Sequence, residues 1–394
     1  RFAYNDLLEK GDADNGGSGG GGGGNYLPPL ASSSHLTGGT ITQYTSGGKY
    51  YQVHTFTTNG SLTINNNTTV DFLIVGGGGG GGMDMGGGGG AGGIVKGVEY
   101  RLFNGVFTIN VGPGGDGAPA GGTNGQPSGA PFTVNAQNGS DSSIVGSSCN
   151  FIAKGGGFGG SSEHDAILGG KGNHGGSGGG ASGYSPNATS GIVQTVSTQN
   201  IYNSNYRVFE YGNKGGSSGL NLGLYSTGGG GAGGAGTSGS NSATNLPDGG
   251  IGIESDILGT SYYWGGGGGG SGYSRTGGNG GNGGGGGGAI GTTTGGSGLN
   301  NGSPGGGGST NYDANRPGGN GGANTGGGGG GSSHNNVNNK GGDGGSGIVI
   351  IRFEYSPNTI SPTYPGGNDG TDGGSYSQDT YSSITNVTGY GNSG

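Results

Sequence analysis

Four residues in the middle of this chain have the types and spacing that could bind a metal ion. Glu163, His164, Asp165 and His174 offer carboxylate and imidazole groups within a short stretch of sequence. Zinc sites use three or four such ligands brought to one point. Closeness in the sequence does not by itself bring ligands together, and exposed loop side chains are the better interpretation. We therefore expect no metal and no cofactor.

Glycine-rich loops can also bind phosphate, but only in a particular context. A Walker loop has Gly-Lys followed by Ser or Thr at the start of a helix. In Gly170-Lys171-Gly172 a glycine follows the lysine, as it does after Lys154, Lys214 and Lys340. A Ser-His-Asp arrangement is not identifiable either, because serine is abundant and acids are few. The sequence predicts neither nucleotide binding nor enzymatic chemistry.

The glycine content sets this chain apart from ordinary globular proteins. It has 121 Gly among 394 residues, with 26% hydrophobic and 9% charged residues, whereas average glycine usage is about 7%. Collagen is excluded, because the glycines come in runs rather than at every third position and there are only 13 Pro. The glycine tracts must therefore be ordered by a structure other than the collagen triple helix.

Charge, cysteine content and hydropathy exclude further classes. A formal net charge of -8 gives no basic surface for nucleic acid. The single cysteine, Cys149, rules out an internal disulfide framework, and we expect it to be a small buried residue. No run of about 18 apolar residues is present, so we expect no membrane span. The chain begins at Arg1 without an apolar signal region, which indicates a processed chain or a fragment.

Strand patterns occur on both sides of the glycine-rich interior. Alternating or β-branched runs predict strands at Tyr50–Thr57, Ser61–Ile64, Val70–Val75, Val106–Val111 and Gly347–Tyr355. Asn59-Gly60, between the first two runs, is typical of a hairpin turn.

The tracts between these strands are predicted to form polyglycine II helices. These helices are extended, with three residues per turn, and their backbone groups point outward. Without a Cβ, neighbouring helices can approach until N–H meets C=O. Each bond contributes about 1 kcal/mol against about 1–2 kcal/mol per ordered residue, so the bundle needs framing strands. Structural glycines of this kind are Gly78, Gly88, Gly266 and Gly328.

The predicted fold is therefore mostly β and irregular, with antiparallel strands framing a polyglycine II sandwich and almost no α-helix. We divide the chain into three parts. Residues 1–37 are an N-terminal arm and glycine linker, residues 38–355 are the glycine-rich sandwich domain, and residues 356–394 are a Ser/Thr/Tyr/Gly-rich tail.

Aromatic residues in and beside the interior loops are the best candidates for recognition. The chain has 20 Tyr, and tyrosine among Ser, Gly and Asn is the composition of antibody paratopes. The same composition suits a loop that packs on a glycine layer, or a subunit interface. The candidate contact residues are Tyr202, Tyr206, Tyr262, Tyr263 and Trp264.

An ordered set of motifs resembles a known family. Val70–Val75 with its glycines, Phe107–Gly115, Gly250–Thr260, Tyr263–Gly266 and Gly344–Phe353 occur in the order found in the glycine-rich domain of phage tail-fibre proteins. This domain is also common in large DNA viruses and some bacterial surface proteins. The resemblance covers about residues 38–355. It implies a layered polyglycine II sandwich whose end loops contact a host receptor, without enzymatic chemistry.

Two functions follow as expectations. The first is a non-enzymatic recognition protein at the cell exterior or virion surface, whose loops bind a cell-surface protein or glycan. The second is an extracellular filament subunit that binds copies of itself through terminal segments. Its assembly arm would use Phe2, Tyr4, Leu7 and Leu8. Ice binding, known for some polyglycine II bundles, is disfavoured by the irregular tracts and broad loops.

Overall fold

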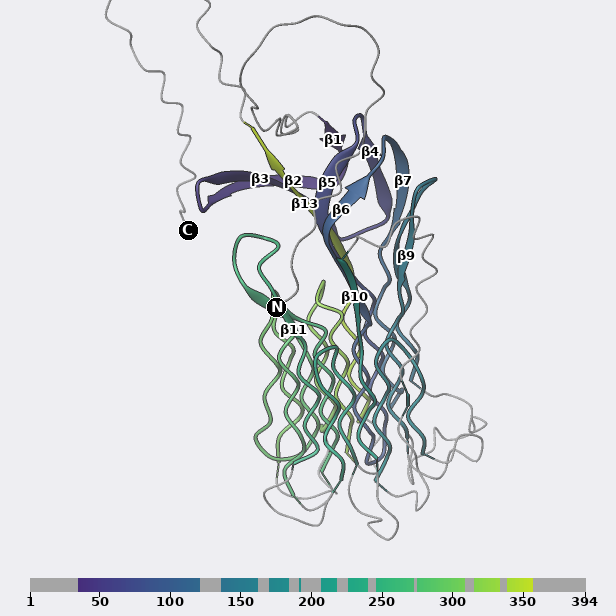
Figure 1. Ribbon diagram of the computed structural model, residues 1–394. Coiled ribbons are helices and arrows are strands. Elements are labelled where there is room, and N and C mark those ends of the chain that lie inside the picture. Colours follow the sequence, from purple (N-terminus) through teal and green to yellow (C-terminus); the bar gives the residue numbers. More distant parts are fainter. Residues whose placement is uncertain are drawn as a thin grey trace, which may run out of the picture. The chain divides into compact units, whose positions relative to one another are not determined.

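The computed structural model describes residues 35–120, 136–161, 170–183, 191–192, 207–217, 226–239, 246–272, 275–308, 315–333 and 339–356. Within these ranges all regular secondary structure is β-strand, and the strands gather at one end of the packed glycine tracts (Figure 1). None of the described residues forms a helix that could cross a lipid bilayer. The predicted fold class is confirmed for this part of the chain.

The larger sheet has six antiparallel strands in the order β10-β6-β5-β13-β3-β2. They are β2 (Thr40–Ser46), β3 (Lys49–Phe56), β5 (Thr68–Val75), β6 (Ile94–Leu102), β10 (Arg207–Tyr211) and β13 (Ile348–Tyr355). β13 lies between β5 and β3, with Ile350 opposite Leu73 on one side and Thr55 on the other. The last described strand, β13, therefore pairs within a sheet that also contains the early strands β2 and β3.

The second sheet has five antiparallel strands in the order β1-β4-β7-β8-β9. They are β1 (Leu36–Thr37), β4 (Gly60–Ile64), β7 (Gly105–Asn110), β8 (Ser142–Val145) and β9 (Asn150–Ala153). A two-stranded hairpin is formed by β11 (Ile253–Ser255) and β12 (Tyr262–Trp264).

Alternation along the strands builds two cores, one on each face of the six-stranded sheet. The core shared with the five-stranded sheet contains Phe72, Phe107 and Phe151, and the Phe72 and Phe151 rings lie 4.8 Å apart. The core on the opposite face contains Ile350 and Trp264, which packs there from the β11–β12 hairpin. Both sides of the central strands are thus buried, because adjacent residues in a strand point to opposite faces.

β5 continues directly into the tract 76–82, which shows how the glycines are held. Successive N–H groups point to three different neighbours, and every third residue returns to the same one. Gly76 donates to the carbonyl of Gly93 at 3.0 Å, and Gly79 donates to the carbonyl of Gly90 at 2.9 Å. A three-residue repeat whose hydrogen bonds point outward is a polyglycine II helix.

Six segments surround the tract 76–82. Three of them accept hydrogen bonds from its N–H groups, and three donate to its carbonyl groups. In that order they are 86–93, 136–141, 339–347, 112–118, 154–161 and 326–333. We call this packing of segments between residues 76 and 347 the glycine slab. Its interior is made of main-chain hydrogen bonds in place of packed side chains.

At the surface of the slab, side-chain oxygens replace the carbonyl groups of a missing neighbour. Asp248 Oδ1 accepts from the Asn279 N–H at 2.6 Å, and Asn279 Oδ1 accepts from the Thr294 N–H at 2.9 Å. On another part of the slab Asn138 Oδ1 accepts from the Phe158 N–H at 2.9 Å. Surface Asn and Asp residues therefore satisfy N–H groups that would otherwise lack an internal partner.

One turn prediction was wrong. Asn59-Gly60 does not close a hairpin, because β3 ends at Phe56 in the six-stranded sheet and β4 starts at Gly60 in the five-stranded sheet. β3 pairs with β13 and β2, which leaves no free edge for β4. The Asn-Gly pair instead carries the chain from one sheet to the other.

Candidate functional site

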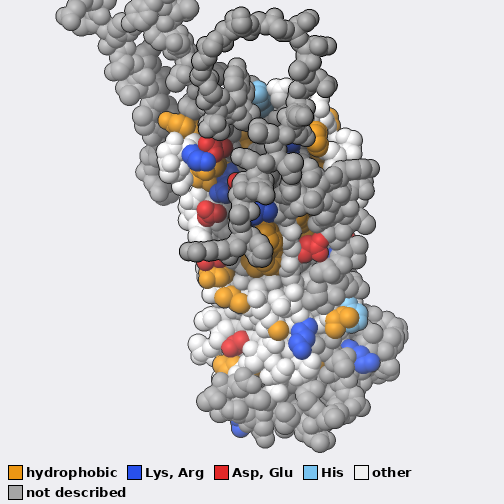
Figure 2. Space-filling view, viewed as in Figure 1, with side chains coloured by type: hydrophobic (Ala, Val, Ile, Leu, Met, Phe, Trp, Pro, Cys, Tyr) orange, Lys and Arg blue, Asp and Glu red, His pale blue; other side chains and the backbone are white. Residues whose placement is uncertain are grey.

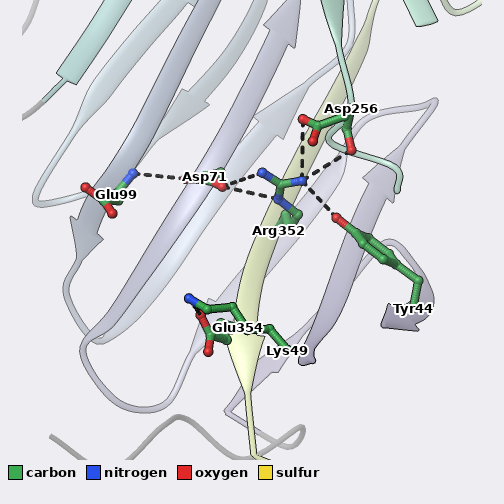
Figure 3. A network of polar contacts seen from close by, with 7 residues as sticks. All are labelled: Tyr44, Lys49, Asp71, Glu99, Asp256, Arg352 and Glu354. Atoms are coloured by element: carbon green, nitrogen blue, oxygen red, sulfur yellow. Dashed lines mark hydrogen bonds and ion pairs between the residues drawn. The ribbon is translucent and has the colours of Figure 1, made fainter. Parts of the chain in front are cut away.

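A polar cluster lies on the sheet face that carries the β11–β12 hairpin, with Arg352 of β13 at its centre (Figure 3). Arg352 Nη2 and Nε donate to Asp71 Oδ2 at 2.7 and 3.2 Å. Its Nη1 donates to the Tyr44 hydroxyl at 2.8 Å and to the Asp256 carbonyl at 3.2 Å. One guanidinium thus ties β13 to β5, β2 and the β11–β12 loop.

Two aromatic rings complete this cluster. The guanidinium carbon of Arg352 lies 5.2 Å from the centre of the Tyr51 ring, which is the range of a cation–π contact. Tyr44 stacks on Tyr51, with ring centres 5.1 Å apart and an interplanar angle of 24°. β3 and the edge strand β2 are therefore held firmly beside β13.

The electrostatics identify the cluster as a structural tie. Burial by itself lowers the pKa of Arg352, but hydrogen bonds to Asp71 and Tyr44 outweigh it and the pKa is raised. Burial raises the pKa of Tyr44, although the neighbouring Arg352 opposes this. Near neutral pH the guanidinium stays charged and the phenol stays protonated, so the hydrogen bonds from Arg352 to Asp71 and Tyr44 persist.

Asp71 also stabilises an irregularity in the sheet. Its Oδ1 accepts from the main-chain N–H of Glu99 at 2.9 Å, and Glu99 has a φ of 53°. The pairing of β5 with β6 shifts register between Val70 and Phe72. This is a β-bulge, a feature that bends a strand and increases its twist.

A hollow of about 700 Å³ opens beside the cluster. Its charged lining residues are Lys49, Arg101, Arg352, Asp71, Glu99 and Glu354. The basic and acidic residues balance, and Lys49 Nζ already pairs with Glu354 at 2.8 Å. Figure 2 likewise shows basic and acidic side chains interspersed on the face that it displays. This hollow has no excess of either charge with which to select an ion.

The β11–β12 hairpin carries three of the predicted contact residues. Trp264 is completely buried in the core behind the sheet. Tyr262 is half-buried and packs against it, with ring centres 6.3 Å apart. Tyr263 points to the other face of the hairpin and is also half-buried. The prediction of a contact role was wrong for Trp264, because an indole with no exposed surface cannot meet an external partner.

The other predicted contact and assembly residues lie outside the described residues. These are Tyr202 and Tyr206 of the contact set, and Phe2, Tyr4, Leu7 and Leu8 of the assembly arm.

The four predicted structural glycines all lie inside the slab. An added Cβ at each one would fall 2.0–2.1 Å from a main-chain carbonyl oxygen of a neighbouring segment. The pairs are Gly78 with Gly327, Gly88 with Gly268, Gly266 with Gly281, and Gly328 with Gly89. Real Cβ atoms do not approach oxygen this closely, so only glycine fits these positions without a shift of the backbone.

The possible metal ligands do not form a site in the described part of the chain. Glu163, His164 and Asp165 lie outside it. His174 is described, and its Nδ1 accepts from the Ile192 N–H at 2.8 Å. Among the described residues, no group of three or more His, Cys, Asp or Glu side chains is placed to hold a metal ion.

Many of the glycine tracts end at the side of the slab that lies away from the sheets (Figure 1). We call this side the far end. Met83–Met85 forms a turn there, with φ values of 54° at Asp84 and 59° at Met85. The Met83 N–H donates to Ser161 Oγ at 3.2 Å, and the Gly183 N–H donates to the Met85 carbonyl at 3.0 Å. Ser271 and Ser332 are hydrogen-bonded to the same tracts beside the turn.

Eight connecting segments continue from described residues at this end. They are 121–135, 162–169, 184–190, 218–225, 240–245, 273–274, 309–314 and 334–338. Their sequences are rich in Asn, Ser, Thr and Gly, include several tyrosines, and contain no Lys or Arg. One further segment, 193–206, joins Ile192 to β10 and so leads to the sheet end.

A second polar chain, inside the sheet core, was not predicted from the sequence. Gln43 Nε2 donates to Gln52 Oε1 at 3.0 Å, and Gln52 Nε2 lies 2.9 Å from His54 Nε2. His54 Nδ1 lies 2.7 Å from the Gly38 carbonyl, which can only accept, so this nitrogen carries the proton. Burial lowers the pKa of His54, and the bond to Gly38 only partly opposes it. His54 is therefore neutral.

The family model of the glycine-rich domain matches residues 55–323, which is more than half of the chain. The chain belongs to this glycine-rich domain family, as the ordered motifs indicated. No curated protein matches the chain in sequence. The segments from residue 324 to 347 and β13 lie beyond the matched range, yet they are hydrogen-bonded into the same slab and sheet.

Proposed function

We propose that this protein is a non-enzymatic recognition protein that works outside the cell or on a virion surface. In this proposal the glycine slab is a rigid mount, and the segments at its far end bind a cell-surface glycan or protein. The observation that carries the proposal is the return of many hydrogen-bonded tracts to one end, from which eight connecting segments continue.

The rigidity of the mount supports this proposal. Each interior tract is bonded to neighbours on all sides, so the points at which the chain leaves the slab have fixed spacing. Loops positioned by a rigid scaffold are the common location of binding residues. Fixed spacing also lowers the entropy lost when several segments engage one ligand.

The composition of the connecting segments favours an uncharged ligand. They contain no Lys or Arg, the side chains that normally bind phosphate, sulfate or carboxylate groups. Their amides, hydroxyls and tyrosine rings are suited to hydrogen bonding and stacking with neutral sugars or with polar protein surfaces. We therefore place a neutral glycan first among the partners.

A panel of immobilised neutral and acidic oligosaccharides tests this function. The full chain should bind members of the neutral group. Replacing segments 162–169, 184–190 and 334–338 with Gly-Ser sequences of equal length should abolish that binding while the thermal unfolding midpoint stays within a few degrees. The matched control replaces 193–206, which leads to the sheet end and should leave binding unchanged.

The variant Tyr263→Ala tests whether the ligand binds at the far end of the slab or at the β11–β12 hairpin. Tyr263 is half-buried at the sheet end of the slab, so its truncation should not alter binding if the far end carries it. Loss of binding in Tyr263→Ala, with full binding by the variant lacking the three far-end segments, would contradict the proposal. Trp264 is unsuitable for this test because its truncation leaves a cavity in the core.

A further inference from the structure

The two larger sheets have four edge strands, and β2 differs from the other three. Its sequence, Thr-Ile-Thr-Gln-Tyr-Thr-Ser, contains no charged residue, and six of its seven residues are exposed. By contrast β10 carries Arg207 and Glu210, whereas β1 and β9 have only two and four residues.

Natural edge strands are normally protected against pairing with other chains. Charged side chains, proline, bulges and very short strands all serve this purpose. β2 has no charge and no proline, and it pairs with β3 in unbroken register from Thr40 to Ser46. No other strand in the described part of the chain pairs with its outer edge. This edge therefore presents a regular row of main-chain groups, which is the template for adding another strand.

The β2 edge is also held in place before any partner arrives. Tyr44 is hydrogen-bonded to Arg352 and stacked on Tyr51, and Gln43 is hydrogen-bonded to Gln52. Ile41, on the same face of the strand as Gln43, is 47% exposed. A preorganised edge loses little entropy on pairing, and a cross-strand neighbour would cover Ile41.

We propose that β2 pairs in antiparallel fashion with β2 of a second copy of this chain, which joins two six-stranded sheets across a two-fold axis. A second copy meets the requirements of this edge, because the added strand must itself be regular and uncharged, and β2 has both properties. Each copy has a formal net charge of -8, so two copies repel at most surfaces. They can approach where neither presents a charge, and like charges directly opposite in a ladder would be unfavourable.

The full seven-residue ladder forms only in one register, with Gln43 on the two-fold axis. Gln43 then faces Gln43 of the second copy, Ile41 faces Thr45, and Thr42 faces Tyr44. In an antiparallel pair the Cα atoms of facing residues lie about 4.5 or 5.5 Å apart. Both separations are within the range that a disulfide bridges.

Cysteine cross-linking tests the register directly. The natural Cys149 is buried, and burial raises the pKa of its thiol to about 12, so it stays unreactive under mild oxidation. Gln43→Cys should give a covalent dimer. Thr108→Cys, on an exposed position of β7, is the matched control and should stay monomeric on a denaturing gel.

A second pair of variants distinguishes this register from random collision. Thr45→Cys alone should cross-link poorly, because its partner is Ile41. The double variant Ile41→Cys/Thr45→Cys should cross-link as well as Gln43→Cys. Equal cross-linking of Thr45→Cys, Thr108→Cys and Gln43→Cys would overturn the proposed pairing.

Sedimentation velocity of the full chain tests the association itself. The wild-type chain should form dimers across micromolar to submillimolar concentrations, and association should stop at two copies. Gln43→Lys places two lysines opposite each other and should weaken dimerisation at least tenfold, with an unchanged circular dichroism spectrum. A chain that is monomeric throughout, or a Gln43→Lys variant that dimerises as well as wild type, would overturn the proposal. So would open-ended polymers that disappear on deletion of residues 1–10, because the assembly arm would then occupy the edge.

Discussion

At the level of single residues, the absence of a side chain decides which positions are critical. In the tract 86–93, Gly88 donates its N–H to the Thr227 carbonyl at 3.0 Å and accepts from the Gly180 N–H at 2.8 Å. These bonds require backbones to approach to a distance that no Cβ permits. The glycines of the slab therefore play the part that interlocking side chains play in an ordinary core.

Gly88→Ala should destabilise the protein strongly, because the new Cβ would lie 2.0 Å from the Gly268 carbonyl oxygen. We expect a loss of about 3 kcal/mol in the free energy of unfolding, the upper range for overpacking a core. Gly307→Ala is the matched control, since a Cβ there meets only the Gly291 oxygen at 3.5 Å. Urea denaturation of both variants measures the difference. Equal stability of the two would mean that the tracts are not closely packed.

His54 should make stability depend on pH in the mildly acidic range. Its pKa in the folded protein lies below the usual 6.5 because it is buried. As pH falls below 6.5, His54 binds a proton in the unfolded chain but stays neutral in the folded chain. The free energy of unfolding therefore decreases. The slope can reach about 1.4 kcal/mol per pH unit.

His54→Asn keeps a donor for the Gly38 carbonyl but removes the titration. The free energy of unfolding, measured between about pH 5 and 7.5, should fall more steeply with decreasing pH in the wild type than in this variant. A parallel pH dependence of the two proteins would show that His54 is not the responsible group.

At the level of elements, Arg352 is the link that the strands and the hairpin share. Its side chain is 16% exposed and that of Asp71 is 24% exposed, so their ion pair is largely shielded from water. The exposed pair of Lys49 and Glu354 lies on the same sheet face. Each pair includes one residue of β13, so the two offer a direct comparison of a shielded and an exposed interaction on that strand.

Arg352→Gln should lower the free energy of unfolding by about 2 kcal/mol, because Asp71 keeps its charge in a largely buried position without its partner. Amide exchange should also quicken in β2 and in residues 253–264, which Arg352 holds in place. Lys49→Gln is the control and should change neither quantity measurably. Unaltered exchange of the hairpin in Arg352→Gln would contradict its role as a tie.

Much of the strand framework could be predicted from the sequence, since β3, β5, β7 and β13 follow apolar or alternating runs. The strand β6 was not predicted, because Lys96, Glu99 and Arg101 interrupt its apolar pattern. The sheet accommodates these side chains at its exposed face and at the bulge. The β11–β12 strands are only three residues long and depend on the core beneath them.

The polar cluster could not be predicted, because its partners are far apart in the chain. Arg352 meets Asp71 across 281 residues and Tyr44 across 308 residues. The two charged residues of the otherwise apolar strand Ile348–Tyr355, Arg352 and Glu354, were the available signal. The critical glycines, by contrast, were predictable as members of tracts, because polyglycine II packing follows from local composition.

At the level of the whole molecule, the account rests on one claim, namely that lateral main-chain hydrogen bonds order the glycine slab. The two apolar cores lie at the sheet end, where β5 leads directly into the tract 76–82. Many weak bonds become stable together because the strands fix the entry point of each tract. Recognition at the far end and pairing at β2 would both depend on this rigidity.

Hydrogen–deuterium exchange of the glycine amides tests this claim most directly. We expect the amides of residues 76–82, 86–93 and 265–272 to exchange as slowly as those of β5 and β13, because each is hydrogen-bonded to a neighbouring segment. Exchange of these glycines at random-coil rates, with β5 and β13 still protected, would contradict the account. The tracts would then be loops on a β-sandwich, and the slab would not exist in solution.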